Sequence, residues 1–333
     1  MSKIKVAFDI GNSSLKIAVF KNNTTKLHEV RMPENMIEND IIAMPNAFSA
    51  FLKKLKKELD LPKGPAGLVL PASHSLCRLI TMPIMTVDQL NLNLPYEFND
   101  FINGEPEQFF CDYALCEPME NETENNEITM MAAVASKQTI SDYVKMFASA
   151  GFKLTLLIPK EISLIRLVEY YKQTLPDNPN EFCFIDIGQT STNIYMIVND
   201  RIQAQRQIAI GLKDVDSVVA DMLNIDIFLA DAYKRANSNN VLECEQCIDI
   251  YNRIAVEVLK VINFYQFTYR NNNLNGIYLI GGGANIKPLK DVLYDAIGMN
   301  FLDVHKLIQG DNDINLSNIC LTVSGIAHAK GSD

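Results

Sequence analysis

One pattern of hydrophobic and polar positions occurs twice in the chain, 177 residues apart, with Asp9 and Asp186 at equivalent positions. The two copies read VAFDIGNSSLKIAVFKNN and FCFIDIGQTSTNIYMIVND. In each, an apolar run ends in Asp-Ile-Gly, a short polar turn follows, and a second apolar run ends in an Asn-containing turn. A third extended stretch follows each copy, TTKLHEVRM and RIQAQRQIAI. The pattern therefore predicts two three-stranded meanders, each opening one of two related halves.

The chain between the copies predicts a helix, a strand pair and a small insert. Residues 47–61 carry apolar residues at helical spacing with lysines between them, which is typical of an amphipathic helix. Residues 67–83 predict a buried strand, a turn and a strand. Residues 84–155 predict a helix, two strands and a helix, with the acidic stretch 117–127 as an exposed loop. We therefore expect a small αββα-type insert subdomain in the first half.

The chain after the second copy is mainly helical and contains a glycine-rich turn. Helical patterns occur at 214–225, 226–237 and 247–270. The strand IYLI then leads into three consecutive glycines and a helix that opens near Pro288. We expect four parts: the N-terminal part of the first half, the insert, the second half with its glycine-rich turn, and a C-terminal helix returning to the first half, at residues 1–83, 84–155, 156–317 and 318–333.

Composition and charge exclude several classes of protein. The 333 residues are 48% hydrophobic and 21% charged, which suits about two folded domains and excludes a disordered chain. The net charge of -10 has the wrong sign for neutralising nucleic-acid phosphates, so we expect no nucleic-acid partner.

The chain also lacks the sequence features of a membrane-inserted or exported protein. No apolar run reaches the roughly 18 to 20 residues that cross a bilayer, and the start of the chain does not look like a signal peptide. The C-terminal stretch lacks a basic amphipathic anchor. We expect a cytoplasmic protein without direct membrane insertion.

The seven cysteines are scattered, and only Cys244 and Cys247 have the spacing of a metal or redox pair. No second pair and no histidine lies near them. We expect these cysteines to pack in the interior rather than bind metal.

The two Asp-Ile-Gly turns carry chemistry suited to phosphate. Glycine lets a ligand approach the backbone closely, and successive N–H groups and nearby hydroxyls can donate to an anion. A carboxylate before the glycine suits a partly hydrated Mg²⁺ ion, so Asp9 and Asp186 are candidate metal ligands through water. A single such turn is commonly only structural, but its repetition with the same flanking strands favours a shared ligand.

The three consecutive glycines, 281 to 283, lie between a strand and a helix. Such a turn admits a nucleotide because no side chain obstructs it and the helix N-terminus favours anions. The segment matches neither the GxGxxG fingerprint nor the GxxxxGK[ST] loop, and a purely structural turn is an equal alternative.

The two Asp-Ile-Gly turns and the glycine triplet resemble the phosphate-1, phosphate-2 and adenosine motifs of the actin, Hsp70 and sugar-kinase ATPase superfamily. They follow one another along the chain in the same order as in that superfamily. The chain most resembles the PilM family of type IV pilus assembly, and more distantly the FtsA division proteins. The resemblance covers nearly the whole chain, through DIGNSSLKIAVF, LVLPASHSLCRLITMP, LPYEFNDFI, IDIGQTSTNIYMIVNDRI and YLIGGGANIKPLKDVLYDAIGMNF. It implies an α/β fold: the actin-like (ribonuclease H-like) duplicated ATPase fold, with two halves around a nucleotide cleft. The implied cofactors are ATP or ADP and Mg²⁺.

The resemblance also assigns residues to the nucleotide. The implied phosphate-binding residues of the two halves are Gly11, Asn12, Ser13, Ser14, Lys16, Gly188, Gln189 and Thr190. Those that would border the adenosine are Gly281, Gly282, Gly283 and Asn285. Asp231 and Lys234, in LADAYKR, are candidates for contacting base and ribose, although such a pair is also common on solvated helix faces.

We expect little or no ATP hydrolysis. ATPases of this superfamily orient the nucleophile with a Glu or Gln from the helix after the insert. The nearest acid here is Glu161, in LLIPKEISLIRLV, and no sugar-kinase catalytic Asp is present. We therefore expect nucleotide binding with slow or no hydrolysis, at most a weak ATPase.

The resemblance implies a scaffold that binds the N-terminal cytoplasmic peptide of a PilN-type inner-membrane protein. The implied groove is lined by residues 76–83 and 94–102. Contacts with other pilus assembly proteins and self-association are further expectations. Two alternatives stay open: a small-molecule kinase on the same fold, and a polymerising cytoskeletal protein of the FtsA or MreB kind.

Overall fold

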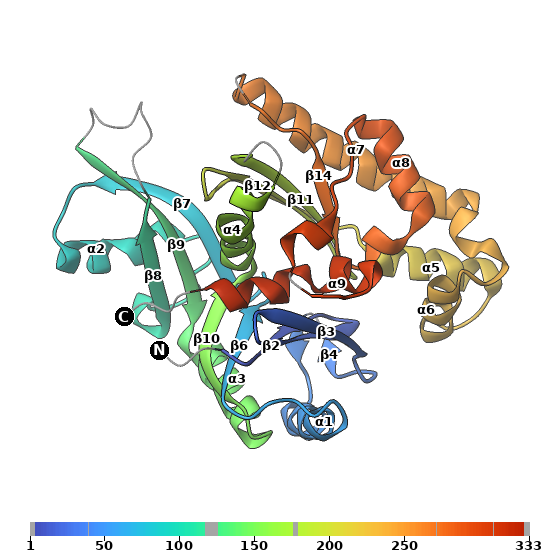
Figure 1. The fold of residues 1–333 in the computed structure, drawn as a ribbon, viewed down its shortest axis with the longest axis horizontal. Helices are drawn as coiled ribbons and strands as arrows, with labels where there is room; N and C mark the ends of the chain where they lie inside the picture. Colours follow the sequence, from blue (N-terminus) through green and yellow to red (C-terminus); the bar gives the residue numbers. More distant parts are fainter. Residues whose placement is uncertain are drawn as a thin grey trace.

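The first half of the protein is built on a five-stranded mixed sheet (Figure 1). The computed structural model describes residues 4–38, 40–116, 126–175, 179–270, 272–308 and 310–329. The strand order is β10-β6-β1-β2-β3: the first three strands along the chain form an antiparallel meander, and β6 and β10 run parallel to β1. The strands are β1 (Val6–Ile10), β2 (Ser14–Lys21), β3 (Thr24–Arg31), β6 (Pro65–Leu70) and β10 (Lys153–Pro159).

The second half repeats this arrangement with four strands in the order β13-β12-β11-β14. They are β11 (Glu181–Ile187), β12 (Thr192–Val198), β13 (Arg201–Ile208) and β14 (Ile277–Ile280). The first three form the meander, and β14 runs parallel to β11. The registers are equivalent, since Asp9 lies opposite Lys16 and Asp186 lies opposite Asn193. The duplicated fold predicted from the sequence is confirmed.

Two helices, α4 (Lys160–Tyr171) and α9 (Ile314–Ser324), lie between the two sheets (Figure 1). Helix α9 contacts β1, β2 and β3 of the first sheet and β14 of the second. Leu164 and Leu321 are fully buried in a core that also contains Phe184 of the second sheet. Because helices cover the sheets on both faces, the central strand of each half is an almost continuous apolar run.

The outer faces of the sheets are covered by helices from each half. Helices α1 (Pro45–Glu58) and α3 (Lys137–Ser149) belong to the first. Phe8 of β1 packs edge-on against Phe147 of α3, with ring centroids 5.1 Å apart. The predicted amphipathic helix is α1, which buries Phe48, Leu52 and Leu55. The second half carries α5 (Leu212–Leu223), α6 (Ile227–Ala236), α7 (Glu245–Thr268) and α8 (Lys287–Ile297).

The cysteine pair begins helix α7. The Cys244 sulfur accepts a hydrogen bond from the Cys247 amide at 3.4 Å, in the position of an N-cap. Cys247 itself is fully buried. Both residues therefore have a structural place in the second half.

The insert has its own sheet and core on one side of the molecule (Figure 1). Its antiparallel strands have the order β7-β9-β8, with β7 (Ser75–Pro83), β8 (Phe109–Leu115) and β9 (Glu127–Ser136). Helix α2 (Val87–Asn93), capped by Thr86, continues into a 3₁₀ turn at Leu94–Phe98. The core of the insert includes Ile80, Met82, Leu90, Leu94, Phe98 and Met130.

The remaining regular elements are short. A two-stranded hairpin, β4 (Ile37–Glu38) and β5 (Ile41–Ile42), follows the first meander. Other 3₁₀ turns occupy Pro106–Gln108, Lys172–Thr174, Ser238–Glu243, Gly282–Asn285, Val304–Leu307 and Gly325–His328.

The expected boundaries between the parts differ from the structure in three places. Strand β7, expected in 1–83, pairs with β9 in the sheet of the insert. Helix α3, expected in the insert, packs on the first sheet. The boundary expected at 156 cuts β10, which pairs with β6. Local sequence patterns indicate that these segments are strands or helices, but their partners come from distant residues and are decided by packing.

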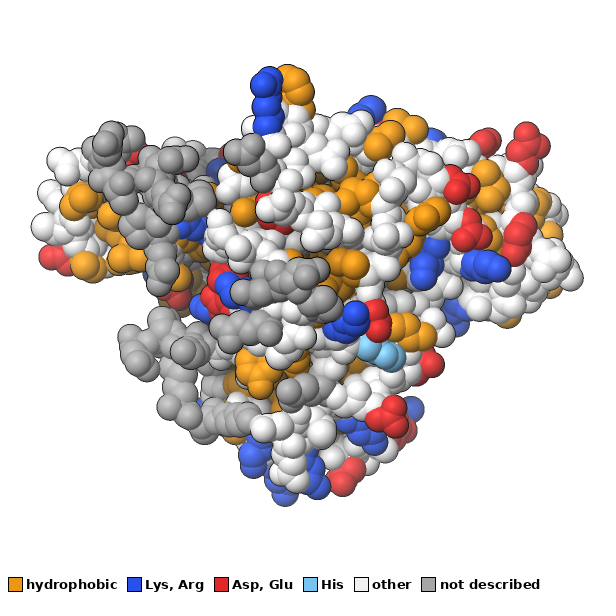
Figure 2. Space-filling view, turned by 45° about the horizontal axis from the view of Figure 1, so that its top comes forward, with side chains coloured by type: hydrophobic (Ala, Val, Ile, Leu, Met, Phe, Trp, Pro, Cys, Tyr) orange, Lys and Arg blue, Asp and Glu red, His pale blue; other side chains and the backbone are white. Residues whose placement is uncertain are grey.

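Two expected segments lie partly outside the described residues: most of the acidic loop, at 117–125, and the C-terminal residues 330–333. On the face shown in Figure 2, basic and acidic side chains are interspersed, and neither sign forms a continuous area. Among the helices of the described residues, none combines the length and hydrophobicity that crossing a bilayer would require.

Candidate functional site

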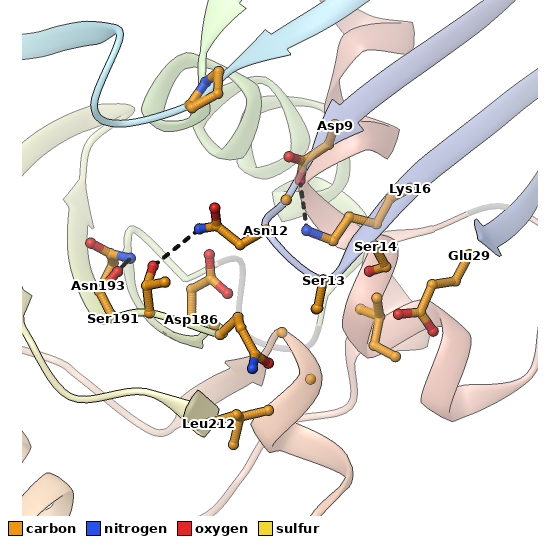
Figure 3. A pocket seen from close by; sticks show the side chains of 18 of the residues that line it. Asp9, Asn12, Ser13, Ser14, Lys16, Glu29, Asp186, Ser191, Asn193 and Leu212 are labelled. Carbon is orange, nitrogen blue, oxygen red and sulfur yellow. Dashed lines mark hydrogen bonds and ion pairs between the residues drawn. The ribbon is translucent and has the colours of Figure 1, made fainter. Parts of the chain in front are cut away.

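A cavity of about 440 Å³ lies between the loops of the two halves (Figure 3). Carboxyl ends of parallel strands meet at one edge of a sheet, and this brings several loops together there. Ser73 follows β6, Lys160 follows β10, and Gly281 follows β14, and all three line the cavity. The predicted nucleotide-binding residues that line it are Asp9, Gly11, Asn12, Ser13, Ser14, Lys16, Asp186, Gly188, Gln189, Thr190, Lys234, Gly281, Gly282 and Asn285.

The two Asp-Ile-Gly turns have the same backbone geometry. The Gly11 amide donates to the Ser14 carbonyl oxygen at 3.0 Å, and the Gly188 amide donates to the Ser191 carbonyl oxygen at 2.9 Å. These two amides therefore hold the turns in shape and do not point at a ligand. What the turns present to the cavity are the polar residues that follow each glycine.

Asn12 connects the turns across the cavity (Figure 3). Its amide nitrogen donates to the Thr190 hydroxyl at 3.3 Å and to the carboxylate of Asp40. The first contact joins the two halves through their equivalent turns.

The carboxylates of both turns are paired with lysines. Asp9 Oδ2 lies 3.8 Å from Lys16 Nζ and accepts a hydrogen bond from the Thr322 hydroxyl at 2.6 Å. Asp186 Oδ2 accepts a hydrogen bond from Lys160 Nζ at 2.7 Å. Burial alone would raise the pKa of Asp9, but Lys16, Lys160 and Thr322 outweigh it and lower this pKa.

Lys160 lies within electrostatic reach of both carboxylates. Burial alone would lower the pKa of Lys160, but Asp186 and Asp9 raise it well above the ordinary value. The ammonium group is therefore charged. The sequence analysis missed this residue, and the available signal was its position next to Glu161, on the helix expected to supply a catalytic side chain.

Glu161, the predicted catalytic residue, is not among the residues that line the cavity. It is 4% exposed, and its Oε2 atom has no hydrogen-bond partner among the described residues. Burial raises the pKa of Glu161 to about 7, although a backbone hydrogen bond and Lys160 oppose this. In the first turn of α4, it is thus Lys160 that faces the cavity.

The glycine triplet is used in two ways. A Cβ atom on Gly281 would lie 2.5 Å from Asp186 Oδ1, and its φ of +81° favours glycine. Gly283 does not line the cavity, and a Cβ atom there would lie 2.4 Å from Cγ2 of Ile187. Gly281 thus keeps space beside a carboxylate, whereas Gly283 allows the turn to pack on β11.

Lys234 and Asp231 belong to a buried network rather than to a solvated surface. Lys234 Nζ lies 2.7 Å from Asp216 Oδ1 and 3.1 Å from Asp231 Oδ1. Gln189 of the second turn donates to Asp216 Oδ2 at 2.7 Å. Burial raises the pKa of Asp216, against the effect of Lys234. Lys234 lines the cavity, whereas Asp231 does not.

Asp231 also connects the halves, because Arg31 of β3 lies 3.0 Å from its carboxylate. Asn285, at the other end of the glycine turn, donates to the Asn315 carbonyl oxygen at 3.0 Å and so attaches this turn to α9. Other cavity residues that the sequence analysis did not single out include Glu29, Asp40, Ser191, Asn193, Gln207 and Arg235.

Solved structures share this architecture. A structure described as a PilM-PilN type IV pilus biogenesis complex matches with a TM-score of 0.78 at 22% identity, over 98% of each chain. The ethanolamine utilization protein EutJ from Carboxydothermus hydrogenoformans matches with a TM-score of 0.57 at 15% identity, over 97% of this chain and 88% of that one. MreB5 of Spiroplasma citri bound to AMPPNP matches with a TM-score of 0.50 at 12% identity, over 91% of each chain. These similarities establish the actin-like ATPase fold.

No curated protein sequence matches the chain significantly. A family model described as "Type IV pilus assembly protein PilM" matches residues 7–321, which include both meanders, the insert and most of α9. The chain therefore belongs to the PilM family of type IV pilus assembly proteins.

Proposed function

We propose that this protein is a nucleotide-binding scaffold of type IV pilus or related secretion assembly, which reaches the membrane by binding the N-terminal cytoplasmic peptide of a PilN-type protein. The main support for nucleotide binding is the cavity between the two repeated turns. Its volume of about 440 Å³ lies in the range of small-molecule and cofactor sites. Its basic residues, suited to phosphate, are Lys16, Lys160, Lys234 and Arg235.

An adenine nucleotide, ATP or ADP, is the ligand that the fold favours. The MreB5 structures of the same fold are described as bound to AMPPNP and to ADP. In the proposed arrangement the polar turns after Gly11 and Gly188 contact the phosphates, and the turn after β14 borders the adenosine. Lys234 would contact base or ribose while Asp231 holds it from behind, at 3.1 Å.

The geometry supports a scaffold with slow or no hydrolysis. Orienting an attacking water requires an acceptor that faces the phosphates. Glu161, the acceptor expected from the helix after the insert, is buried away from the cavity, and its neighbour Lys160, which faces the cavity, is a charged donor. The Mg²⁺ ion expected at Asp9 and Asp186 fits these residues poorly, because both carboxylates already have a lysine partner.

The edge of β7 is a suitable place for the peptide. On the side of β7 that faces β9, the amide of Ile84 donates a hydrogen bond to the carbonyl oxygen of Asn126. On the opposite side, the carbonyl oxygen of Cys77 accepts a hydrogen bond from the side-chain amide of Gln205 at 3.1 Å. Backbone groups alternate along a strand, so those of Leu79 and Thr81 point away from β9. An extended peptide can pair with such an edge. Exposed apolar side chains from the adjoining segment of the insert are Ile84, Val87, Leu92 and Tyr96.

The nucleotide part is tested by calorimetric titration with ATP and with ADP. We expect Lys16→Met to weaken binding by about tenfold or more, the value of a hydrogen bond to a charged group. The matched control is Lys21→Met, which changes an exposed lysine of the same strand outside the cavity. Equal affinity of Lys16→Met and Lys21→Met for both nucleotides would refute the assignment.

The peptide part is tested with a synthetic peptide of the N-terminal cytoplasmic segment of the PilN-type protein. Thr81→Pro removes one N–H group from the open edge of β7 without breaking the ladder to β9. We expect it to weaken peptide binding, while Thr81→Val, which keeps the N–H group, binds normally. Unchanged peptide affinity of Thr81→Pro would argue against the edge of β7.

The two alternative functions make different demands. A small-molecule kinase needs ATP turnover that a metabolite stimulates, which the position of Glu161 does not favour. A polymerising protein would sediment as filaments with ATP. Rapid turnover or ATP-dependent sedimentation would replace the scaffold function with one of these.

A further inference from the structure

The two carboxylates expected to hold a hydrated Mg²⁺ ion are already neutralised by the protein. Lys160 Nζ lies 2.7 Å from Asp186 Oδ2, and Lys16 Nζ lies 3.8 Å from Asp9 Oδ2. Asp9 Oδ2 is further occupied by the Thr322 hydroxyl at 2.6 Å. Within the described part of the chain, no group of three or more His, Cys, Asp or Glu side chains is placed to hold a metal ion.

Lys160 is held at this position by the fold. It follows β10, whose Pro159 pairs with Leu70 of β6, and β6 in turn pairs with β1 up to Asp9. The first residue of α4 therefore emerges at the same edge of the sheet as Asp9. Its side chain is 17% exposed and that of Asp186 is 9% exposed, so water screens this ion pair only weakly.

A hydrated Mg²⁺ ion and a lysine ammonium serve the same purpose beside a polyphosphate, since each places positive charge against the phosphate oxygens. The ion needs acidic oxygens that are free to bind its water shell. Here the Oδ2 atom of each carboxylate is hydrogen-bonded or ion-paired to the protein, and the ammonium groups of Lys16 and Lys160 line the cavity beside them.

We propose that Lys160, together with Lys16, takes the place of the metal ion, so that this protein binds the phosphates of its nucleotide without a divalent cation. This inference rests on the proposed nucleotide site and identifies the ligand as metal-free ATP or ADP. Lys160 is thus a specificity-determining residue that selects the metal-free form of the ligand.

The test is calorimetric titration of the whole protein with ATP and with ADP, once with excess EDTA and once with MgCl₂. We expect wild type to bind in EDTA at least as tightly as in Mg²⁺. Lys160→Met should lose about tenfold or more in EDTA, because a charged hydrogen bond to phosphate is removed. Lys160→Glu should bind in EDTA more weakly still and regain affinity when Mg²⁺ is added.

Two further variants control for folding. Lys160→Met leaves Asp186 buried without its partner, so the double variant Lys160→Met/Asp186→Asn removes both charges together and is expected to show the same loss in EDTA. Lys172→Met removes a lysine that pairs with Asp200 outside the cavity, and we expect it to bind like wild type. Circular dichroism and thermal unfolding identify any variant that does not fold.

The possible results separate the two proposals. Wild-type binding that requires Mg²⁺ and disappears in EDTA would overturn the metal-free site but retain the nucleotide scaffold. Normal binding of folded Lys160→Met in EDTA would also overturn it. No binding of either nucleotide with or without Mg²⁺ would refute the proposed function and this inference together.

Discussion

Glu161 carries a carboxyl group that is sealed from water and from the cavity. The residue is 4% exposed, and Oε2 has no hydrogen-bond partner among the described residues. Burial raises its pKa from the ordinary 4.5 to about 7, against the opposing effects of a backbone hydrogen bond and Lys160. Replacing it with Gln preserves the shape of the protonated group and removes the ionisation.

The size of the effect follows from this change in pKa. A carboxyl group with a higher pKa in the folded than in the unfolded protein binds its proton more tightly when folded. Its contribution to stability is therefore fully present below pH 4.5 and is lost as the pH rises to about 7. A pKa difference of one corresponds to about 1.4 kcal/mol, so the loss is about 3 kcal/mol. We expect Glu161→Gln to match wild type near pH 4.5 and to be more stable by about 3 kcal/mol near pH 8.

The assay is urea unfolding of both proteins at the two pH values. Other titrating groups contribute equally to wild type and variant, so the difference between the proteins at each pH isolates Glu161. A stability difference that is the same at both pH values would refute the burial argument. Glu161 would then be ionised at neutral pH, and its role as a catalytic carboxylate would have to be reconsidered.

Three other substitutions test the packing and polar contacts around the site. Gly325→Ala places a Cβ atom 2.0 Å from the Ser163 carbonyl oxygen, and we expect it to lower the free energy of unfolding by about 1 to 3 kcal/mol. The assay is the melting temperature, and an unchanged value would contradict this contact between α4 and the end of α9. Asp216→Asn leaves Lys234 with Asp231 as its one acidic partner among the described residues, which should lower the free energy of unfolding in urea by about 3 kcal/mol. A loss below about 1 kcal/mol would show that the pair is solvated. Cys244→Ala should lower stability in calorimetry by about 1 kcal/mol while Cys244→Ser does not, and equal stabilities would exclude the N-cap role.

The fold and the family could be recognised from the amino-acid sequence alone. Each meander can be predicted from a short stretch of sequence, because its buried strands are apolar runs on both sides of an Asp-Ile-Gly turn. This pattern of residues occurs twice in the chain. The glycines after IYLI added the third motif in order. Fourteen of the sixteen residues assigned to the nucleotide line one cavity, all except Asp231 and Gly283. Their roles in binding are still predictions.

Which of the two neighbouring residues Lys160 and Glu161 faces the cavity could be learned only from the packed structure. Lys160 and Glu161 both lie in the first turn of α4, and successive residues of a helix point about 100° apart. The local pattern does not show which one meets the carboxylates, because that depends on how β10 pairs with β6 and on where α4 crosses the sheet. The sheet to which β7 belongs and the pairing of Lys160 with Asp186 likewise depend on contacts between distant residues, whereas Lys16 lies opposite Asp9 within the first hairpin. Sequence periodicity reports which face of an element is apolar, whereas the identity of the groups across a cavity depends on the packing of the whole chain.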